Sequence, residues 1–249
     1  MRKIAELKNI SLINTEKDYL QDLMLFSLYS KIGKELIFKG GTCLYKIYKL
    51  NRFSEDLDFT LVKKIDLNKL SDKIILDFSL LNIKCKIKEI IEHKTEINIR
   101  FLFNGPLYKG NKETQCFIPL NLSLKEKVIL EPKRETIIPL YKEIPSFELF
   151  VMQEQEILSE KIRAVMTRDK PRDVYDSWFL LTKKKVEPDF KLINKKLELY
   201  SLKFDLNHFK KAVNRKKGLW DTDLKNLIIG ELPDFDKTQA EILNRFLLF

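Results

Sequence analysis

Residues 38–61 constrain the fold of this chain more than any other segment, because they join a glycine turn to an acidic strand. Seven glycines occur in the chain, and two of them, Gly40 and Gly41, are adjacent here. Residues 35–39 predict a short buried strand that ends at these glycines, and a helix is expected to open at Thr42, which could cap it or offer its hydroxyl to a phosphate. Glycine lets a phosphate approach the backbone, and N–H groups at a helix start attract anions. An ordinary strand-to-helix turn is the alternative.

An acidic pair follows the turn. In the stretch DLDFTL at residues 56–61, the apolar side chains share one face of a strand, and Asp56 and Asp58 project from the other. Two carboxylates roughly 6 Å apart repel each other by about 2–3 kcal/mol at an effective dielectric near 20. A cation, a proton or open water has to offset this repulsion. Mg²⁺ suits the position, since it commonly takes one or two carboxylates together with substrate phosphates; a half-exposed strand with an acidic face is the alternative.

Charged residues in the C-terminal half form a second candidate group. A period near 3.6 in the apolar residues predicts a helix over residues 147–167, with Lys161 at the border of its buried face. Lys161 could extend outward to solvent or direct its charge into a cleft. Pro171 suits the first turn of a following helix. Asp173 lies in that turn, where the helix dipole by itself explains the presence of a carboxylate. The dipole does not explain Asp176, which lies one turn later, so Asp176 is the preferred functional residue.

The order of the patterns predicts an α+β fold. A helix over residues 15–32, capped by Thr15, precedes the glycine turn. After the acidic strand we expect a helix near residues 66–81 and strands near residues 83–90, 95–103, 115–124 and 134–140. The pattern is helical after Pro145. We therefore expect a mixed sheet with flanking helices in a domain over residues 1–145, followed by a mainly helical domain over residues 146–249.

Two motifs resemble the signatures of the AbiEii/AbiGii toxin family, within the nucleotidyltransferase superfamily related to DNA polymerase β. The first is KGGT-x-L followed by R-x-S-x-D-x-D-F at residues 39–59, and the second is E-x-x-x-E-K-x-x-A followed by RD-x-x-D at residues 156–176. They occur in the expected order, and the resemblance covers roughly residues 15–185. The resemblance implies a nucleotidyltransferase-like core in which the helical domain contributes Lys161 and Asp176 to the cleft.

The resemblance also implies a role for each matching residue. Nucleotide binding is expected at Gly40, Gly41, Thr42, Ser54, Lys161 and Asp173, with Lys161 on the triphosphate. Catalytic roles are expected for Asp56, Asp58, Lys161 and Asp176, and Asp56 and Asp58 are the expected ligands of Mg²⁺, or of Mn²⁺ in its place. The implied reaction moves a nucleoside monophosphate from a nucleoside triphosphate to an RNA acceptor, expected to be tRNA, and releases pyrophosphate. The resemblance further implies that the reaction inhibits growth and that a cognate antitoxin is a partner of the protein.

One residue departs from the superfamily pattern. The superfamily usually carries a third carboxylate on a later strand, where the alternating stretch 118–124 has Asn121. Asparagine cannot act as a base and offers a metal only a neutral oxygen. Glu96 could substitute, Asp176 could supply the base, or the chemistry could be weakened. Two other function classes therefore stay open: a catalytically silent RNA-binding protein that retains the fold, and a metal-dependent phosphohydrolase, against which the glycine turn and Lys161 argue.

The composition agrees with a cytoplasmic protein whose partners are polyanions such as nucleic acids. The formal net charge is +10, although the basic runs are dispersed as on solvated helix ends. The three cysteines are widely spaced and match no disulfide or zinc pattern, and the two histidines are isolated. The start of the chain lacks the apolar core of a signal peptide, and no apolar run reaches the length of a membrane span. We therefore expect no membrane contact.

Overall fold

The computed structural model describes residues 1–248, which form two compact units. The first, here called the sheet unit, comprises Met1–Ile47, Phe53–Val128 and Pro132–Val151. The second, the helical unit, comprises Tyr48–Arg52, Ile129–Glu131 and the chain from Met152 on. Two short segments that interrupt the sheet unit in sequence therefore belong to the helical unit.

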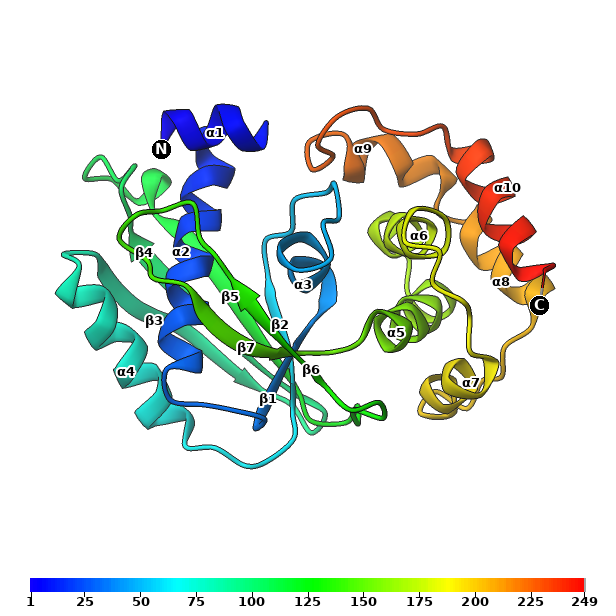
Figure 1. Ribbon diagram of the computed structural model, residues 1–249, viewed down its shortest axis with the longest axis horizontal. Coiled ribbons are helices and arrows are strands. Elements are labelled where there is room, and N and C mark those ends of the chain that lie inside the picture. The colour runs from blue at the N-terminus through cyan, green and yellow to red at the C-terminus, as the bar shows by residue number, and fades with distance from the viewer. Residues whose placement is uncertain (249) are drawn as a thin grey trace. The chain divides into compact units, whose positions relative to one another are not determined.

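Within residues 1–248, the sheet unit is built on a seven-stranded mixed sheet in the order β3-β4-β5-β2-β1-β7-β6 (Figure 1). The strands are β1 Leu36–Lys39, β2 Leu57–Leu61, β3 Lys84–Glu92, β4 Glu96–Asn104, β5 Cys116–Ser123, β6 Lys133–Ile137 and β7 Phe147–Val151. β2 runs parallel to β5 and β1 parallel to β7, and the other pairs are antiparallel. The helices of this unit are α1 Arg2–Lys8, α2 Leu12–Tyr29, α3 Gly40–Lys46 and α4 Leu67–Leu80, with a 3₁₀ turn at Lys112–Thr114.

Strand alternation gives this sheet one apolar and one polar face. The buried side chains on the apolar face include Leu57, Phe59, Ile97, Ile99, Leu120 and Leu122. Helices α2 and α4 cover this face (Figure 1), and Phe78 of α4 packs on Phe103 of β4 with ring centroids 4.7 Å apart. The opposite face carries Asp58, Asn121 and Asn98, which lie level on three neighbouring strands. Asp58 and the two asparagines beside it therefore project from the face opposite the one that α2 and α4 cover.

The α+β fold is confirmed, but several local expectations are wrong, and the first concerns the start of α2. α2 begins at Leu12, and its cap is Ser11, whose side chain accepts a hydrogen bond from the backbone N–H of Asn14 at 3.1 Å. Thr15 already lies inside the helix and donates to the carbonyl of Ser11 at 2.8 Å. Serine and threonine are both good caps, and the helix begins about one turn earlier than expected.

The second error concerns the segment after Pro145, which is not helical at first. Phe147–Val151 forms β7, and the helix expected from residue 147 begins only at Glu154. In β7 the side chains of Phe147, Leu149 and Val151 are buried, while their neighbours are not. A short apolar run of this kind fits a strand or a helix equally well by periodicity, and pairing with β1 and β6 decides for the strand.

From Glu154 onward the helical expectation holds. The helices are α5 Glu154–Thr167, α6 Pro171–Trp178, α7 Phe190–Glu198, α8 Leu206–Asn214, α9 Trp220–Leu224 and α10 Phe235–Phe246, with a π turn at Phe179–Lys183 and a 3₁₀ turn at Lys217–Leu219. Pro171 is in the first turn of α6, as predicted. Four rings, Phe190, Phe204, Phe209 and Phe246, form a core cluster in this unit. No helix within residues 1–248 is long and apolar enough to cross a membrane.

Candidate active site

Gly40 and Asp58 are packed against each other where β1 ends. Lys39, the last residue of β1, pairs with Asp58 of β2, so the next residue, Gly40, lies beside the aspartate. A Cβ added to Gly40 would be 2.3 Å from Oδ2 of Asp58, and the φ angle of Gly40 is +73°. Any other residue would meet both the strain of a left-handed backbone and a clash with the carboxylate. The first glycine of the glycine turn and the second aspartate of the acidic pair therefore form one packed unit.

Thr42 connects α3 to the acidic pair. Its hydroxyl donates to the backbone carbonyl of Asp56 at 2.5 Å, and its side chain is buried. The expectation that Thr42 opens or caps the helix is wrong, because α3 begins at Gly40 and Lys39 occupies the cap position without a side-chain bond. Thr42 thus holds the backbone at Asp56, and its contact with a nucleotide stays a prediction.

Asn121 lies beside Asp58, at the place where a third carboxylate was expected. β5 runs parallel to β2 with Asn121 level with Asp58, and its Nδ2 donates to Oδ1 of Asp58 at 2.9 Å. The neutral amide orients the carboxylate without adding a second negative charge. Glu96 is one strand further away, level with Ser123, and accepts from Asn98 at 3.2 Å. The strand register therefore does not favour Glu96 as a replacement for the missing acid.

A buried ion pair on the same face has no counterpart in the sequence predictions. Lys39 contacts the carboxylate of Glu126, and the two side chains are 7% and 9% exposed. Lys39 shares its face of the sheet with Asp58, because directly opposite residues of a ladder project to the same side. Lys39 belongs to the first motif, but nothing in the sequence pairs it with an acid 87 positions later. The cation lies close to the acidic pair and is already partly neutralised by Glu126.

The acidic pair fits a metal ion that arrives with a phosphate ligand. Within residues 1–248, no three or more His, Cys, Asp and Glu side chains are grouped so that they could hold a metal. Asp56 and Asp58 offer two hard carboxylates, and Asn121 sets the orientation of one of them. Mg²⁺ usually keeps several waters and is bound by one or two carboxylates plus substrate phosphates. The donor set thus suits Mg²⁺ shared with a nucleotide and does not suit a closed structural metal site.

The loop in front of Asp56 is held by α2, which sequence reasoning did not connect with the site. The side-chain amide of Gln21 donates to the carbonyls of Ser54 and Glu55, both at 2.9 Å. Lys17 lies 2.5 Å from the carboxylate of Glu55. Ser54 itself is buried, so these contacts restrain the chain just before the acidic pair.

The other end of α3 is anchored by buried charges. Lys46 Nζ lies 2.8 Å from Oδ1 of Asp18 and 2.6 Å from Oδ1 of Asp22. Burial by itself would raise the pKa of Asp18, but Lys46 and Lys8 outweigh it and lower that pKa to about 2. The pKa of Asp22 is raised, chiefly by burial. Because α3 begins at the glycine turn, this cluster fixes the direction in which the turn enters its helix.

In the helical unit, the residues of the second motif form a buried charge cluster. Lys161 Nζ lies 3.0 Å from Oδ1 of Asp173 and 2.8 Å from Oδ2 of Asp176. Arg52 donates to both oxygens of Asp176, through Nε and one terminal nitrogen, each at 2.9 Å. Arg168 donates to both oxygens of Asp173 at 2.7 and 2.9 Å. We call these five residues the Lys161 cluster; its three cations and two carboxylates leave one formal positive charge.

The cations decide the protonation states in the Lys161 cluster. Burial would raise the pKa of Asp176, but Arg52 and Lys161 hold it below its usual value. The pKa of Asp173 is likewise lowered, because Lys161 and Arg168 outweigh its burial. Burial would lower the pKa of Lys161, but the two aspartates raise it. A carboxylate with both oxygens bound to cations is a poor general base, so this environment favours a role for Asp176 in orienting Arg52 and Lys161.

Arg52 is a residue that the sequence reasoning missed. It stands in the first motif, ahead of the acidic pair, but no role was assigned to it. Its side chain is 2% exposed, and the bidentate bond to Asp176 joins the two motifs across 124 positions. The same unit contains a similar pairing, since Lys196 lies 2.7 Å from Glu156 and 3.0 Å from Glu160, two acids of the second motif. Much of the second motif therefore serves the internal structure of the helical unit.

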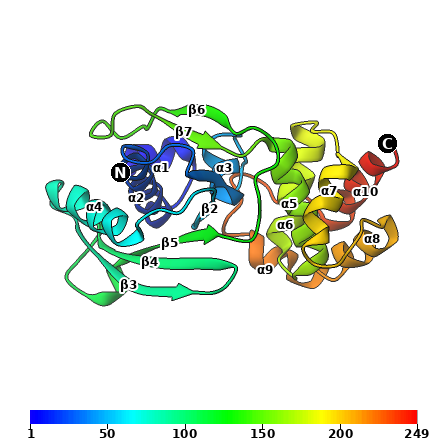
Figure 2. The same ribbon diagram turned by 90° about the horizontal axis from the view of Figure 1, so that it is seen from below.

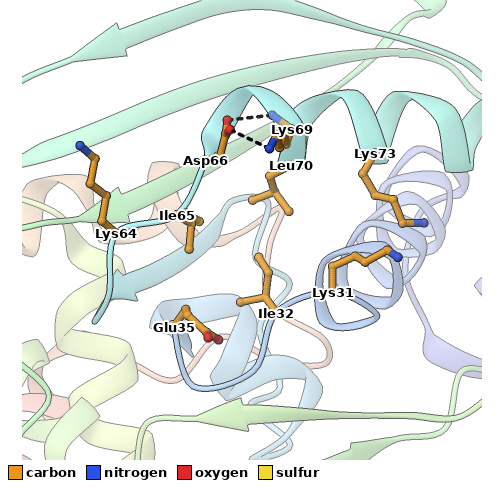
Figure 3. A pocket seen from close by; sticks show the side chains of 9 residues that line it. All are labelled: Lys31, Ile32, Glu35, Lys64, Ile65, Asp66, Lys69, Leu70 and Lys73. Carbon is orange, nitrogen blue, oxygen red and sulfur yellow. Dashed lines mark hydrogen bonds and ion pairs between the residues drawn. The ribbon is translucent and has the colours of Figure 1, made fainter.

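A cavity of about 450 Å³ lies elsewhere in the sheet unit (Figure 3). Its lining comprises Lys31, Ile32, Glu35, Lys64, Ile65, Asp66, Lys69, Leu70 and Lys73. Glu35 precedes β1 and Lys64 follows β2, whereas Gly40 follows β1 and Asp56 precedes β2. The cavity is therefore at the opposite end of these two strands from the glycine turn, and none of the predicted site residues lines it.

Comparisons with known proteins bear on the family and the fold of this chain. The family model described as nucleotidyl transferase AbiEii toxin, type IV TA system, matches residues 24–241. Among solved structures, JHP933 from Helicobacter pylori is 23% identical with a TM-score of 0.63, covering 96% of this chain and 92% of that one. A structure described as a putative nucleotidyltransferase from H. pylori is 21% identical with a TM-score of 0.64, covering 96% and 95%. The nucleotidyltransferase toxin MenT4 from Mycobacterium tuberculosis is 17% identical with a TM-score of 0.68, covering 98% and 87%.

At these identities the structural likenesses show the fold alone. A comparison with curated proteins gives no match.

Proposed function

Because the chain belongs to the AbiEii nucleotidyl transferase toxin family of type IV toxin–antitoxin systems, we propose that it moves a nucleoside monophosphate from a nucleoside triphosphate to an RNA acceptor. Pyrophosphate is the other product, and tRNA is the acceptor that the family resemblance favours. The packing of Gly40 against Asp58 is the observation that carries the proposal. It joins a turn that suits a phosphate chain to a carboxylate that suits a cation.

The residues of the glycine turn and the acidic pair, with Asn121 and Thr42, have separate roles in the proposed reaction. The backbone of Gly40 and Gly41 lets the triphosphate approach closely, because neither residue has a side chain. Asp56 and Asp58 hold Mg²⁺, which when bound stabilises negative charge on the phosphate oxygens. Asn121 keeps Asp58 in one orientation through its 2.9 Å hydrogen bond. Thr42 keeps Asp56 next to the turn.

The finer assignments in the helical unit follow from the family resemblance. Lys161 is proposed to contact the triphosphate, and Asp173 and Asp176 to hold it in position. The excess positive charge of the Lys161 cluster supports this, since a triphosphate is strongly anionic. Growth inhibition, a cognate antitoxin and a cytoplasmic location complete the proposal.

The test incubates the purified protein with Mg²⁺, each α-labelled nucleoside triphosphate and total RNA. We expect label in RNA, and we expect Asp58→Asn to lower incorporation at least about 10²-fold, since metal-borne charge stabilisation contributes several kcal/mol. Thermal unfolding checks that the variant stays folded. Unchanged incorporation by Asp58→Asn would overturn the proposal. With γ-labelled triphosphate, RNA-independent release of free phosphate would select a phosphohydrolase instead, and RNA binding with steep salt dependence but no turnover would select a silent binding protein.

A further inference from the structure

The polar face of the sheet continues past Asp58 as an exposed surface on β5, β4 and β3. These strands are neighbours, and β3 forms the edge of the sheet (Figure 2). Two residues from Asn121 toward the start of β5, Pro119 is level with Arg100 of β4. Two residues further, Phe117 is level with Leu102, which pairs with Lys86 of β3. All these positions project to the side that carries Asp58.

Phe117 is an unusual residue for this surface. It is the second residue of β5, and 36% of it is exposed. The ammonium group of Lys88 lies 4.5 Å from the centre of its ring. The ladder between β3 and β4 shifts register between Ile87 and Glu89, and a bulge of this kind re-aims a side chain. The bulge brings Lys88 over the ring of Phe117.

Further basic side chains lie on the neighbouring strands. Lys84, Lys86 and Lys88 of β3 are exposed, and Arg100 of β4 is 53% exposed at its side chain. The one acid among them is Glu89, which lies 3.2 Å from Arg100. Four cations against one carboxylate make this part of the sheet positive. We call Lys84, Lys86, Lys88, Arg100 and Phe117 the β3–β5 face.

An exposed aromatic ring among basic residues on an open sheet matches the chemistry of single-stranded nucleic acid. A base stacks on the ring, and the phosphates pair with the cations. A side chain of lysine is long and flexible, so Lys88 can leave the ring to a base and pair with the adjoining phosphate. An acidic protein segment would use the cations but gains nothing from a flat exposed ring.

We propose that the β3–β5 face binds a single-stranded stretch of the nucleic-acid acceptor, with one base stacked on Phe117. The inference rests on the proposed transfer reaction for the identity of the acceptor. Phe117 lies four residues from Asn121 along β5, or roughly 13 Å at the rise of a strand. Asn121 in turn contacts Asp58. A single-stranded RNA that crosses the β3–β5 face toward Asp58 therefore has its end placed at the acidic pair.

Binding of a fluorescein-labelled single-stranded oligoribonucleotide, followed by anisotropy without nucleotide or Mg²⁺, tests the stacking. We expect Phe117→Leu to weaken binding about 5- to 150-fold, the range measured for loss of one base–aromatic stack. Phe117→Trp should restore it, because tryptophan keeps a flat ring. Wild-type affinity in Phe117→Leu would overturn the proposal.

A matched pair of charge variants tests the phosphate contacts. Lys86→Ala/Lys88→Ala should reduce the slope of log K against log salt by about 1.4, the value for two phosphate contacts on a single strand. Lys64→Ala/Lys69→Ala removes the same charge from the same unit at the cavity in Figure 3 and should leave the slope unchanged. An equal loss in both pairs would mean that net charge alone drives binding and would overturn the proposal. Competition by polyglutamate that depends equally on Phe117 would assign the face to an acidic protein instead.

The transfer assay separates the two proposals. Phe117→Leu should raise KM for RNA and leave KM for the nucleoside triphosphate unchanged. Wild-type transfer kinetics in Phe117→Leu would reject the β3–β5 face and leave the reaction standing. Oligoribonucleotide binding that depends on Phe117 in a protein without transferase activity would reject the reaction and keep the face as a nucleic-acid surface.

Discussion

Replacing Gly40 by alanine tests whether the turn and the acidic pair are one packed unit. The new Cβ would lie 2.3 Å from Oδ2 and 2.9 Å from Cβ and Cγ of Asp58, so the aspartate has to move. The left-handed backbone adds about 1–2 kcal/mol of strain, and forcing extra volume into a packed site adds about 1–3 kcal/mol. We expect a loss of about 2–5 kcal/mol in the free energy of unfolding. Since a displacement near 1 Å at a reacting centre can lower a rate about 10²-fold, nucleotide transfer should fall by a similar factor.

Urea unfolding and label incorporation measure the two effects, and Gly110→Ala is the matched control. Gly110 also has a positive φ, +92°, but a Cβ there meets nothing within 4 Å. In Gly110→Ala, backbone strain alone should lower the free energy of unfolding, by about 1–2 kcal/mol, and the activity should be unchanged. In an Asp58→Gly background, where the clashing atoms are gone, Gly40→Ala should cost no more than this control. Equal losses for Gly40→Ala and Gly110→Ala in the wild-type background, with activity retained, would refute the reasoning.

Three further predictions concern buried charges and thiols. Arg52→Met leaves the buried carboxylate of Asp176 without its bidentate partner and should lower the free energy of unfolding by about 3 kcal/mol or more; a loss under about 1 kcal/mol in urea unfolding would contradict the pairing. Because the pKa values of Asp173 and Asp176 are lowered on folding, the unfolded chain takes up protons first, and the stability from these groups is present above about pH 5 and lost as the pH falls below about 4. Asp173→Asn should flatten this acid limb, and an unchanged limb would argue against the ion pairs. Burial raises the pKa of the Cys85 and Cys116 thiols to about 12, so a thiol reagent at pH 8 should modify both about 10³-fold more slowly in native than in urea-unfolded protein.

Features that depend on neighbouring residues were predictable. The strand that carries Asp58, the turn at Gly40 and the helix that starts at Pro171 follow from alternation, from glycine backbone freedom and from the fixed φ of proline, although β2 begins at Leu57 and leaves Asp56 just ahead of it. The family and the α+β fold followed from the two motifs in their order. The presence of Asn121 in place of the third carboxylate was also predictable, because alternation along a strand shows which residue projects to the same side as the acidic pair.

Local pattern failed where a distant partner made the choice. Phe147–Val151 was predicted to be helical, but it has an alternation that only its pairing with β1 and β6 turns into a strand. The β3–β5 face was not anticipated either, since Phe117 in isolation looks like a core residue. Its exposure depends on which side of β5 is covered by helices.

The sequence by itself therefore determined the family, the fold class and the local shape of the turn and the acidic strand, because these depend on short stretches of backbone and side-chain order. The tertiary structure alone decided how those parts are held. It packed Asp58 onto Gly40, paired Lys39 with Glu126, and joined Arg52 to Asp176 over 124 positions. A charge that is removed from water must find a partner of opposite sign, but which of many distant candidates it meets depends on strand register and helix packing.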